Sequence, residues 1–288
     1  MTQHFSRRTV LATAGASGAL AMVPGMAFAA DPMIPPATIA AREGAPIIPK
    51  KVNKLFNNSP TIKEPNDMQF DSEGKLWLLD QVDPNKVFTV DPKDGKILNS
   101  FVTECIHGSG ITIGDGALWL TSTKALSGPP VTMKVDIKTG ATIKKWETPG
   151  WGVYGVYASN GAEIQARSKL PLASGGHGVK WAGNGQYWMA VPASGKLYLM
   201  NAEDNTIART IQAPTVRTHG IALDPDGEHL WCVGSDEMEI YKLQKADGKI
   251  VAKIKLEKGT DPSLHGLDMK DGVLWYCDAN KGWICNLT

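Results

Sequence analysis

Short apolar runs alternate with turn-forming dipeptides along most of the chain, and this pattern predicts short antiparallel strands. A typical unit is an apolar run, an Asp-Gly or Asn-Gly pair, and a second run that contains Leu-Trp or Tyr-Trp. Such a dipeptide between two apolar runs favours a β-hairpin. A second hairpin follows in most units, for example from 87–91 through Asp94-Gly95 to 96–98. One unit is therefore expected to form a sheet of four short strands.

The unit repeats, and most copies open with the dipeptide His-Gly. The histidines at this position are His107, His177, His219 and His265, and an earlier copy has Asn66 in their place. Three of the four steps between these positions are 41, 42 and 46 residues. Four strands in this length are typical of one blade of a β-propeller.

We therefore expect an all-β fold, a β-propeller of four-stranded antiparallel blades. Five units are visible, and the 70-residue step from 107 to 177 leaves room for a sixth; we favour five blades and an insertion at 150–176. The last unit has only three strands before the chain ends. The stretch 52–56 is expected to supply its fourth strand, because closing the ring removes exposed strand edges. The propeller domain is then 51–288.

The first 29 residues are expected to be an export signal. Arg7-Arg8 precedes a stretch of apolar and small residues, and Ala27-Phe28-Ala29 fits a cleavage site, which is typical of a twin-arginine signal. A membrane anchor is the alternative, but the apolar stretch is short and broken by Gly and Pro. We expect a periplasmic or secreted protein in which residues 30–50 form an extended arm.

The charge balance favours small-molecule partners. The chain without residues 1–29 has 28 basic and 29 acidic residues. This gives no reason to expect nucleic acid, or a membrane after signal cleavage, as a partner. We expect a monomer with a small-molecule substrate.

The recurring histidines predict a metal site. Equivalent residues of successive blades lie around the central axis, so the four imidazoles should converge, with Asn66 near them. Neutral imidazole binds divalent transition metals well. Ligation by nitrogen argues against Ca²⁺ and Mg²⁺ as the primary ion; we favour Zn, and Fe, Cu and Mn remain open. The alternative is that each His has a structural role and bonds to the backbone of the neighbouring blade.

Four residues near the ring are candidate catalytic groups. Asp67 and Glu104 could act as general bases or support the ligands. Arg217, two residues before a ring histidine, could bind an anionic substrate, and Tyr154 on the insertion could donate a proton. The alternatives are a solvated or turn-capping carboxylate, a surface cation and a packed aromatic ring.

Five further residues are expected outside the site. Lys124 and Asp80 follow the second strands of their units and are expected at the other end of the channel. His229 falls at a turn and is expected to be exposed. Cys277 and Cys285 flank a turn, and an oxidising compartment would permit a disulfide between them, although neighbours across a hairpin are often poorly oriented for one.

The repeat resembles those of known propellers. The segment from Glu64-Pro65-Asn66-Asp67 to Leu76-Trp77 resembles the gluconolactonase and regucalcin family. The repeated His-Gly…Asp-Gly…Leu-Trp is similar to virginiamycin B lyase and to NHL-type propellers. This resemblance implies an axial divalent metal and either lactone hydrolysis or elimination from a small organic molecule. Only Asn66 and Asp67 match the lactonase pattern residue by residue, and the later copies depart from it by having His.

These observations together predict a metal-dependent propeller enzyme, a lactonase-like hydrolase or a lyase. An Fe- or Cu-dependent redox enzyme on the same histidines is the second hypothesis, since imidazoles suit both metals. A non-catalytic binding propeller is the third, because the fold alone does not determine function.

Overall fold

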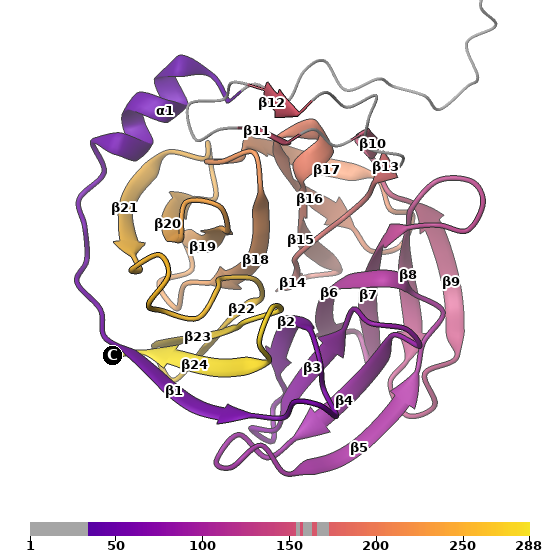
Figure 1. The fold of residues 1–288 in the computed structure, drawn as a ribbon. Helices are drawn as coiled ribbons and strands as arrows, with labels where there is room; N and C mark the ends of the chain where they lie inside the picture. Colours follow the sequence, from indigo (N-terminus) through magenta and orange to yellow (C-terminus); the bar gives the residue numbers. More distant parts are fainter. Residues whose placement is uncertain (1–33, 154–155, 158–162, 166–172) are drawn as a thin grey trace, which may run out of the picture.

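The protein forms five four-stranded antiparallel sheets arranged around a central axis (Figure 1). The computed structural model describes residues 34–288 except 154–155, 158–162 and 166–172. The prediction of a β-propeller with five blades is confirmed. No helix among the described residues is long and apolar enough to cross a membrane.

The blades follow one another along the chain, each from its inner to its outer strand. Blade 1 contains β2 (Pro65–Phe70), β3 (Leu76–Asp80), β4 (Lys86–Val90) and β5 (Ile97–Val102). Blade 2 contains β6 (Ile106–Gly114), β7 (Ala117–Lys124), β8 (Val131–Asp136) and β9 (Thr142–Glu147). Blade 3 contains β14 (Val179–Gly183), β15 (Gln186–Val191), β16 (Lys196–Asn201) and β17 (Ile207–Gln212). Blade 4 contains β18 (Thr218–Leu223), β19 (His229–Gly234), β20 (Glu239–Gln244) and β21 (Ile250–Lys255).

The last blade joins the two ends of the domain. It contains β22 (Leu267–Lys270), β23 (Val273–Cys277), β24 (Trp283–Leu287) and, as its outer strand, β1 (Val52–Asn57). Strand β1 pairs antiparallel with β24, so that Val52 lies opposite Leu287. The predicted closure of the ring by an N-terminal strand is confirmed.

The inner strands surround the axis in the order β2, β6, β14, β18, β22, and β22 contacts β2 again (Figure 1). They approach each other so closely that only glycine fits at one position in each of blades 2, 3 and 4. A Cβ atom on Gly110, Gly178 or Gly220 would clash with a backbone carbonyl oxygen of the next blade, that of His177, His219 or His265, respectively. The glycine of the repeat is therefore required by the packing of the inner strands.

The hydrophobic core lies between neighbouring blades, as the Leu-Trp pairs predict. Trp119 is almost completely buried, and its ring centroid lies 5.6 Å from that of Trp146 and 5.7 Å from that of Trp181. These stacked rings join blades 2 and 3. Residues of the turns also hold the strands in place. Asp71, in the turn between β2 and β3, accepts a hydrogen bond from the indole nitrogen of Trp77 at 2.8 Å.

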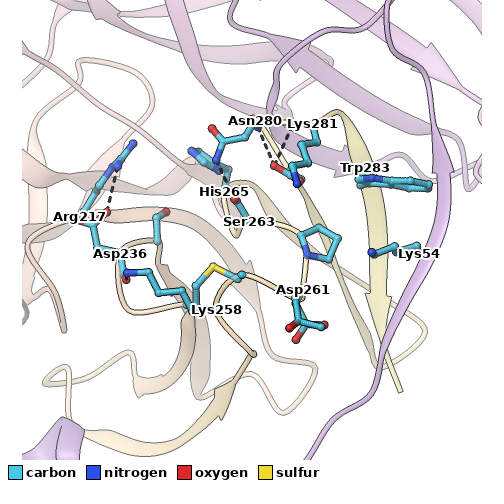
Figure 2. A pocket seen from close by; sticks show the side chains of 16 residues that line it. Lys54, Arg217, Asp236, Lys258, Asp261, Ser263, His265, Asn280, Lys281 and Trp283 are labelled. Atoms are coloured by element: carbon cyan, nitrogen blue, oxygen red, sulfur yellow. Dashed lines mark hydrogen bonds and ion pairs between the residues drawn. The ribbon is translucent and has the colours of Figure 1, made fainter.

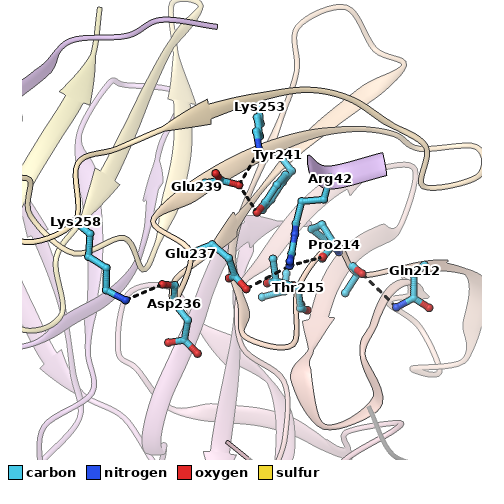
Figure 3. A network of polar contacts seen from close by, with 12 residues as sticks. Arg42, Gln212, Pro214, Thr215, Asp236, Glu237, Glu239, Tyr241, Lys253 and Lys258 are labelled. Carbon is cyan, nitrogen blue, oxygen red and sulfur yellow. Dashed lines mark hydrogen bonds and ion pairs between the residues drawn. The ribbon is translucent and has the colours of Figure 1, made fainter. Parts of the chain in front are cut away.

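The segment before the propeller differs from the extended arm expected for 30–50, because it contains a helix, α1 (Pro36–Glu43). Pro at its start and three alanines favour a helix there. Arg42 fixes the helix to blade 4, where it pairs with Glu237 at 3.3 Å (Figure 3). Both side chains are more than nine-tenths buried, so the arm is a packed part of the fold.

Four short strands lie between blades 2 and 3, in the predicted insertion. They are β10 (Gly152–Val153), β11 (Val156–Tyr157), β12 (Glu163–Gln165) and β13 (Ala173–Ser174), and η2 (Pro192–Ser194) is a short 3-10 helix in blade 3. Strand β10 pairs with β13, and β11 pairs with β12. The segment therefore forms two separate small sheets and no sixth blade among its described residues.

Candidate active site at one mouth of the channel

Five residues occupy equivalent positions around the axis, one from each blade, in the inner strand or within two residues before it. Each stands directly before the residue that packs against the next blade; they are Asn66, Ser109, His177, His219 and His265. Three of the four predicted histidines therefore belong to one ring. Blade 2 contributes Ser109 to it, and His107 lies two residues nearer the start of β6. We call these five residues the axial ring.

The imidazole of His219 is in contact with the other two imidazoles of the axial ring. The ring centroids of His177 and His219 are 4.4 Å apart, and those of His219 and His265 are 5.0 Å apart. His107 has a positive φ of 56°, which is uncommon for a residue with a side chain. The predicted convergence of imidazoles is thus seen for three blades.

The four imidazoles are neutral at physiological pH. Burial holds the pKa of His177 and of His219 well below the usual range. Burial, followed by the charge of Arg217, lowers the pKa of His265 to about 3. Burial and then the charge of Lys124 lower that of His107 to about 4. Neutral imidazoles are the form that binds a metal or accepts a proton.

Some of these nitrogens have no hydrogen-bond partner among the described residues. Both ring nitrogens of His219 and Nδ1 of His265 are buried without one. An unpaired buried polar atom is costly, so a group that binds these nitrogens would stabilise the site. Imidazole nitrogens of this kind can bind a divalent transition metal. In the described part of the chain, no group of three or more His, Cys, Asp or Glu is already arranged to hold an ion.

The ring nitrogens of His177 are engaged by serines. Nε2 lies 2.9 Å from the Ser174 hydroxyl, and Nδ1 lies 3.2 Å from that of Ser109. The Ser109 hydroxyl also donates to Oδ1 of Asn66 at 2.8 Å. The amide of Asn66 in turn donates to Gln81. Of the five predicted metal ligands, His177 and Asn66 are therefore already hydrogen-bonded to protein groups.

Asp67 lies beside the axial ring, but it is fully buried and joins blades. Its carboxylate accepts from the backbone N–H of Ile111 at 3.0 Å and of Leu267 at 3.3 Å, in the two neighbouring blades. Burial raises the pKa of Asp67 to about 7, and the charge of Lys180 opposes that shift. These contacts indicate that Asp67 holds the inner strands together.

The other predicted catalytic residues have different locations. Arg217 is at the mouth, and its charge lowers the pKa of all four clustered imidazoles; its guanidinium is half exposed and pairs with Asp236 at 3.1 Å. Glu104 is exposed and pairs with Lys145 on the outer strand β9, so the structure does not bring it to the imidazoles. Tyr154 lies outside the described residues.

The expectation that Lys124 and Asp80 lie at the other end of the channel is wrong. The second strand of each hairpin ends beside the start of the first, so Lys124 pairs with Ile106 and Asp80 with Pro65. Lys124 is therefore near His107. The carboxylate of Asp80 accepts from the backbone N–H of Glu64 at 3.1 Å and has a turn-capping role.

A buried ion pair crosses the axis three residues beyond the axial ring. Nζ of Lys180, from β14, lies 3.2 Å from Oδ1 of Asp268 in β22. It also donates to the carbonyl oxygen of Met68 at 2.9 Å and to Oε1 of Gln69 at 3.0 Å, both in β2. Strand β14 is not a neighbour of β2 or β22 in the ring of inner strands, so Lys180 spans the channel. We call this ion pair the channel floor.

A pocket of about 310 Å³ adjoins the axial ring between blades 4 and 5 (Figure 2). His265 and Arg217 are part of its wall. Buried atoms of the wall lack a hydrogen-bond partner among the described residues, namely Oγ of Ser235 and Oδ2 of Asp278, in addition to Nδ1 of His265. The pocket is large enough for a small polar molecule, and it places that molecule next to the imidazole of His265.

The cysteines take no part in the site. All four are buried and free, so the disulfide considered between Cys277 and Cys285 is absent. In the register of β23 and β24, Cys277 lies opposite Ile284, and Cys285 lies opposite Tyr276. The two cysteines are thus offset by one residue.

The expectation that His229 is exposed at a turn is wrong. It is the first residue of β19 and is partly buried, because its ring pairs with Asp226 of the preceding turn at 2.8 Å.

Sequence reasoning missed the serines and the channel floor. Ser109 precedes a glycine in Gly-Ser-Gly, so the pattern of a polar residue before glycine could have identified it. Lys180, Asp268 and Gln69 each stand two residues after the residue that follows a member of the axial ring, namely Gly178, Gly266 and Asp67. Because side chains alternate along a strand, each of the three points to the same side of its strand as that residue. For Ser174, in the insertion, we find no signal in the sequence.

Comparisons with known proteins support the fold. No known family's sequence profile matches the chain, and no curated protein matches it in sequence. The crystal structure of glutaminyl cyclase from Myxococcus xanthus is similar with a TM-score of 0.60 and 8% identity, covering 84% of this chain and 97% of that one. A streptogramin B lyase gives 0.48 and 17%, covering 83% and 97%. Virginiamycin B lyase from Staphylococcus aureus gives 0.48 and 16%, covering 83% and 99%. The chain is a five-bladed β-propeller, and it shares this fold with the glutaminyl cyclase.

Proposed function

We propose that the protein is an enzyme that hydrolyses, or eliminates a group from, a small organic molecule at the mouth of the channel. The observation that carries this proposal is the cluster of neutral, buried imidazoles, three of whose ring nitrogens have no partner among the described residues. Such a cluster is expensive to bury, and perturbed titratable groups beside a pocket are typical of functional sites.

A divalent metal ion, with Zn favoured, fits these nitrogens. His219 and His265 would hold it, with His107 as a third imidazole on the same side of the channel. When bound, such an ion polarises a carbonyl group or activates water. Three imidazole ligands would leave a position open for substrate, as is usual in catalytic zinc sites.

The chain's own residues supply the other parts of the site. Arg217 at the mouth can bind an anionic group of the substrate, and the adjoining pocket can hold the rest of a small, oxygen-rich molecule. His177 is neutral and can accept a proton. The channel floor closes the axis below the ring, so substrate would enter from one mouth only.

The metal content of purified protein tests this proposal. Wild type exported by its own signal should contain about one ion per chain, and His219→Ala and His265→Ala should each lose most of it. His229→Ala is the matched control, because His229 lies at the start of β19, where it pairs with Asp226 and takes no part in the axial ring, and this variant should keep the ion. Zinc would favour hydrolysis or elimination, whereas stoichiometric Fe or Cu would favour a redox enzyme. A metal-free wild type whose function survives both substitutions would instead indicate a binding propeller.

A further inference from the structure

A chain of hydrogen bonds begins at Ser174 and passes through His177. The Ser174 hydroxyl is 2.9 Å from Nε2 of His177, and Nδ1 of the same ring is 3.2 Å from Oγ of Ser109. The imidazole therefore connects a hydroxyl in the insertion with a hydroxyl of blade 2. Either nitrogen of a neutral imidazole can carry the proton, so the direction of these two bonds must come from the groups beyond Ser109.

Those groups end at a carboxylate. Ser109 bonds to Oδ1 of Asn66 at 2.8 Å, and Nδ2 of Asn66 bonds to Oε1 of Gln81. Nε2 of Gln81 lies 2.6 Å from Oε2 of Glu64. An ionised carboxylate only accepts hydrogen bonds, so Glu64 fixes the orientation of the Gln81 amide.

That one fixed orientation determines every bond in the chain. Because Gln81 donates to Glu64, its carbonyl oxygen accepts from the amide of Asn66. The carbonyl oxygen of Asn66 then accepts from the single proton of Ser109, so Oγ of Ser109 accepts from Nδ1–H of His177. His177 is thus the tautomer with a proton on Nδ1 and a lone pair on Nε2.

The lone pair on Nε2 accepts the proton of Ser174. A hydroxyl bonded to an imidazole, whose other nitrogen is held by an acceptor, is the arrangement that activates a serine for nucleophilic attack. In the usual form of this arrangement a carboxylate contacts the imidazole directly. Here the negative charge of Glu64 acts through two amides and one hydroxyl, which point in one direction and polarise one another.

The serine is also accessible. Ser174 and His177 are both half-buried, whereas His219 and His265 are buried. Ser174 is therefore less enclosed than these two imidazoles, and part of its surface is open to a substrate. Its neighbour Gly175 is held by a backbone bond to Thr123 at 2.9 Å, which fixes the position of the serine next to blade 2.

We propose that Ser174 is a nucleophile, that His177 is its general base, and that the site cleaves an ester or lactone. Oγ of Ser174 forms a bond to the acyl carbon, and its proton passes to Nε2 of His177. The bond from the acyl carbon to the leaving oxygen breaks, and that oxygen takes the proton from His177. Water then attacks the acyl-enzyme in the same way, which releases the acid and restores Ser174.

This proposal deepens the hydrolytic form of the proposed function and rests on the same mouth of the channel. It does not depend on a metal ion. Ser109, Asn66, Gln81 and Glu64 do not touch the substrate in it; they are positioning residues that hold His177 in the reactive tautomer. Because their effect passes through His177, changing the charge of Glu64 should alter the reactivity of Ser174 without removing it.

Covalent labelling with a fluorophosphonate probe tests the proposal in the full-length protein. The probe forms a bond between its phosphorus and an activated serine oxygen and releases fluoride, and mass spectrometry locates the adduct. We expect one adduct on Ser174, which His177→Ala and Ser174→Ala abolish. Glu64→Gln should slow labelling by about tenfold, the loss of one charge-assisted hydrogen bond. Glu73→Gln, an exposed glutamate of the same blade, should label at the wild-type rate.

Three outcomes would overturn the proposal: no adduct on wild type, an adduct elsewhere, or equal labelling of Glu64→Gln and wild type. Equal melting temperatures of Glu64→Gln and Glu73→Gln would show that slow labelling is not a folding defect. The labelling is repeated with a chelator present, and it should persist. A protein that binds zinc but is not labelled retains the proposed function and loses this inference. A metal-free protein that is labelled retains this inference and the hydrolytic function but loses the proposed metal site.

Discussion

Replacing Lys180 with Met should destabilise the protein strongly. The side chains of Lys180 and Asp268 are only 4% and 6% exposed, and Nζ contacts three groups from two other blades. Without the ammonium group, the carboxylate of Asp268 stays buried with the backbone N–H of Phe70 at 2.6 Å and the amide of Gln69 at 3.2 Å as its donors. Leaving one partner of a buried ion pair uncompensated costs about 3–5 kcal/mol. A fold of this kind is stable by only about 5–15 kcal/mol.

Urea unfolding followed by tryptophan fluorescence at pH 7 measures this loss. The matched control is Lys75→Met, because Lys75 forms an exposed pair with Glu73, and surface pairs contribute about 0–1 kcal/mol. The double variant Lys180→Met, Asp268→Leu should regain part of the loss, since an apolar replacement of both partners removes the unpaired charge.

A loss for Lys180→Met below about 1 kcal/mol, similar to that of the control, would refute the reasoning. It would mean that water reaches Asp268 and that the channel is open through the floor. A double variant less stable than Lys180→Met would also contradict it, because the remaining carboxylate would then not be the source of the cost.

Three further predictions concern other parts of the chain. Gly178→Ala should destabilise the protein by about 1–3 kcal/mol in urea unfolding, because the new methyl group would meet backbone of blade 4. Burial raises the pKa of Asp67 from 3.8 to about 7, so the folded state holds that proton more tightly than the unfolded state does, and stability should fall as pH rises from about 4 to about 7. Asp67→Asn should show a flatter dependence over that range, and an unchanged slope would contradict the assignment. If 1–29 is an export signal, wild type should appear outside the cytoplasm as a chain of 259 residues, and Arg7→Lys with Arg8→Lys should remain inside at 288; equal export of both on a fractionation blot would exclude the signal.

The blade architecture could be read from the sequence because it depends on local patterns. Alternating apolar runs and two-residue turns specify each hairpin, and the repeat length specifies the blade. The closing strand could be predicted from the missing fourth strand of the last unit. The helix at Pro36–Glu43 was missed although Pro at its start and three alanines are local signals for it. What could not be predicted is its place on blade 4, because Arg42 and Glu237, which fix it there, are far apart in the sequence.

The site was only partly predictable, because register decides it. The segment Ile-His-Gly-Ser-Gly in blade 2 contains two residues that precede a glycine, and an irregularity between Gly108 and Gly110 selects Ser109 for the axial ring. The repeat pattern therefore predicted His107 for the position in the axial ring that Ser109 occupies. The connection from Glu64 to Ser174 joins four separate segments, and no spacing along one chain reveals it. Glu104 is close to the site in sequence, but it lies in the connection between β5 and β6, and its exposed side chain pairs with Lys145 of β9.

The pairing of β1 with β24 has a consequence for how the molecule is made. Strand β1 is synthesised before every other strand of the five blades, and its partner β24 is synthesised after all of them. Until β24 has been made, Val52–Asn57 has no strand to pair with. The ring can therefore close only after all five blades have been synthesised, and loss of Trp283–Leu287 would leave β1 and β23 each with an unpaired edge that other molecules could contact.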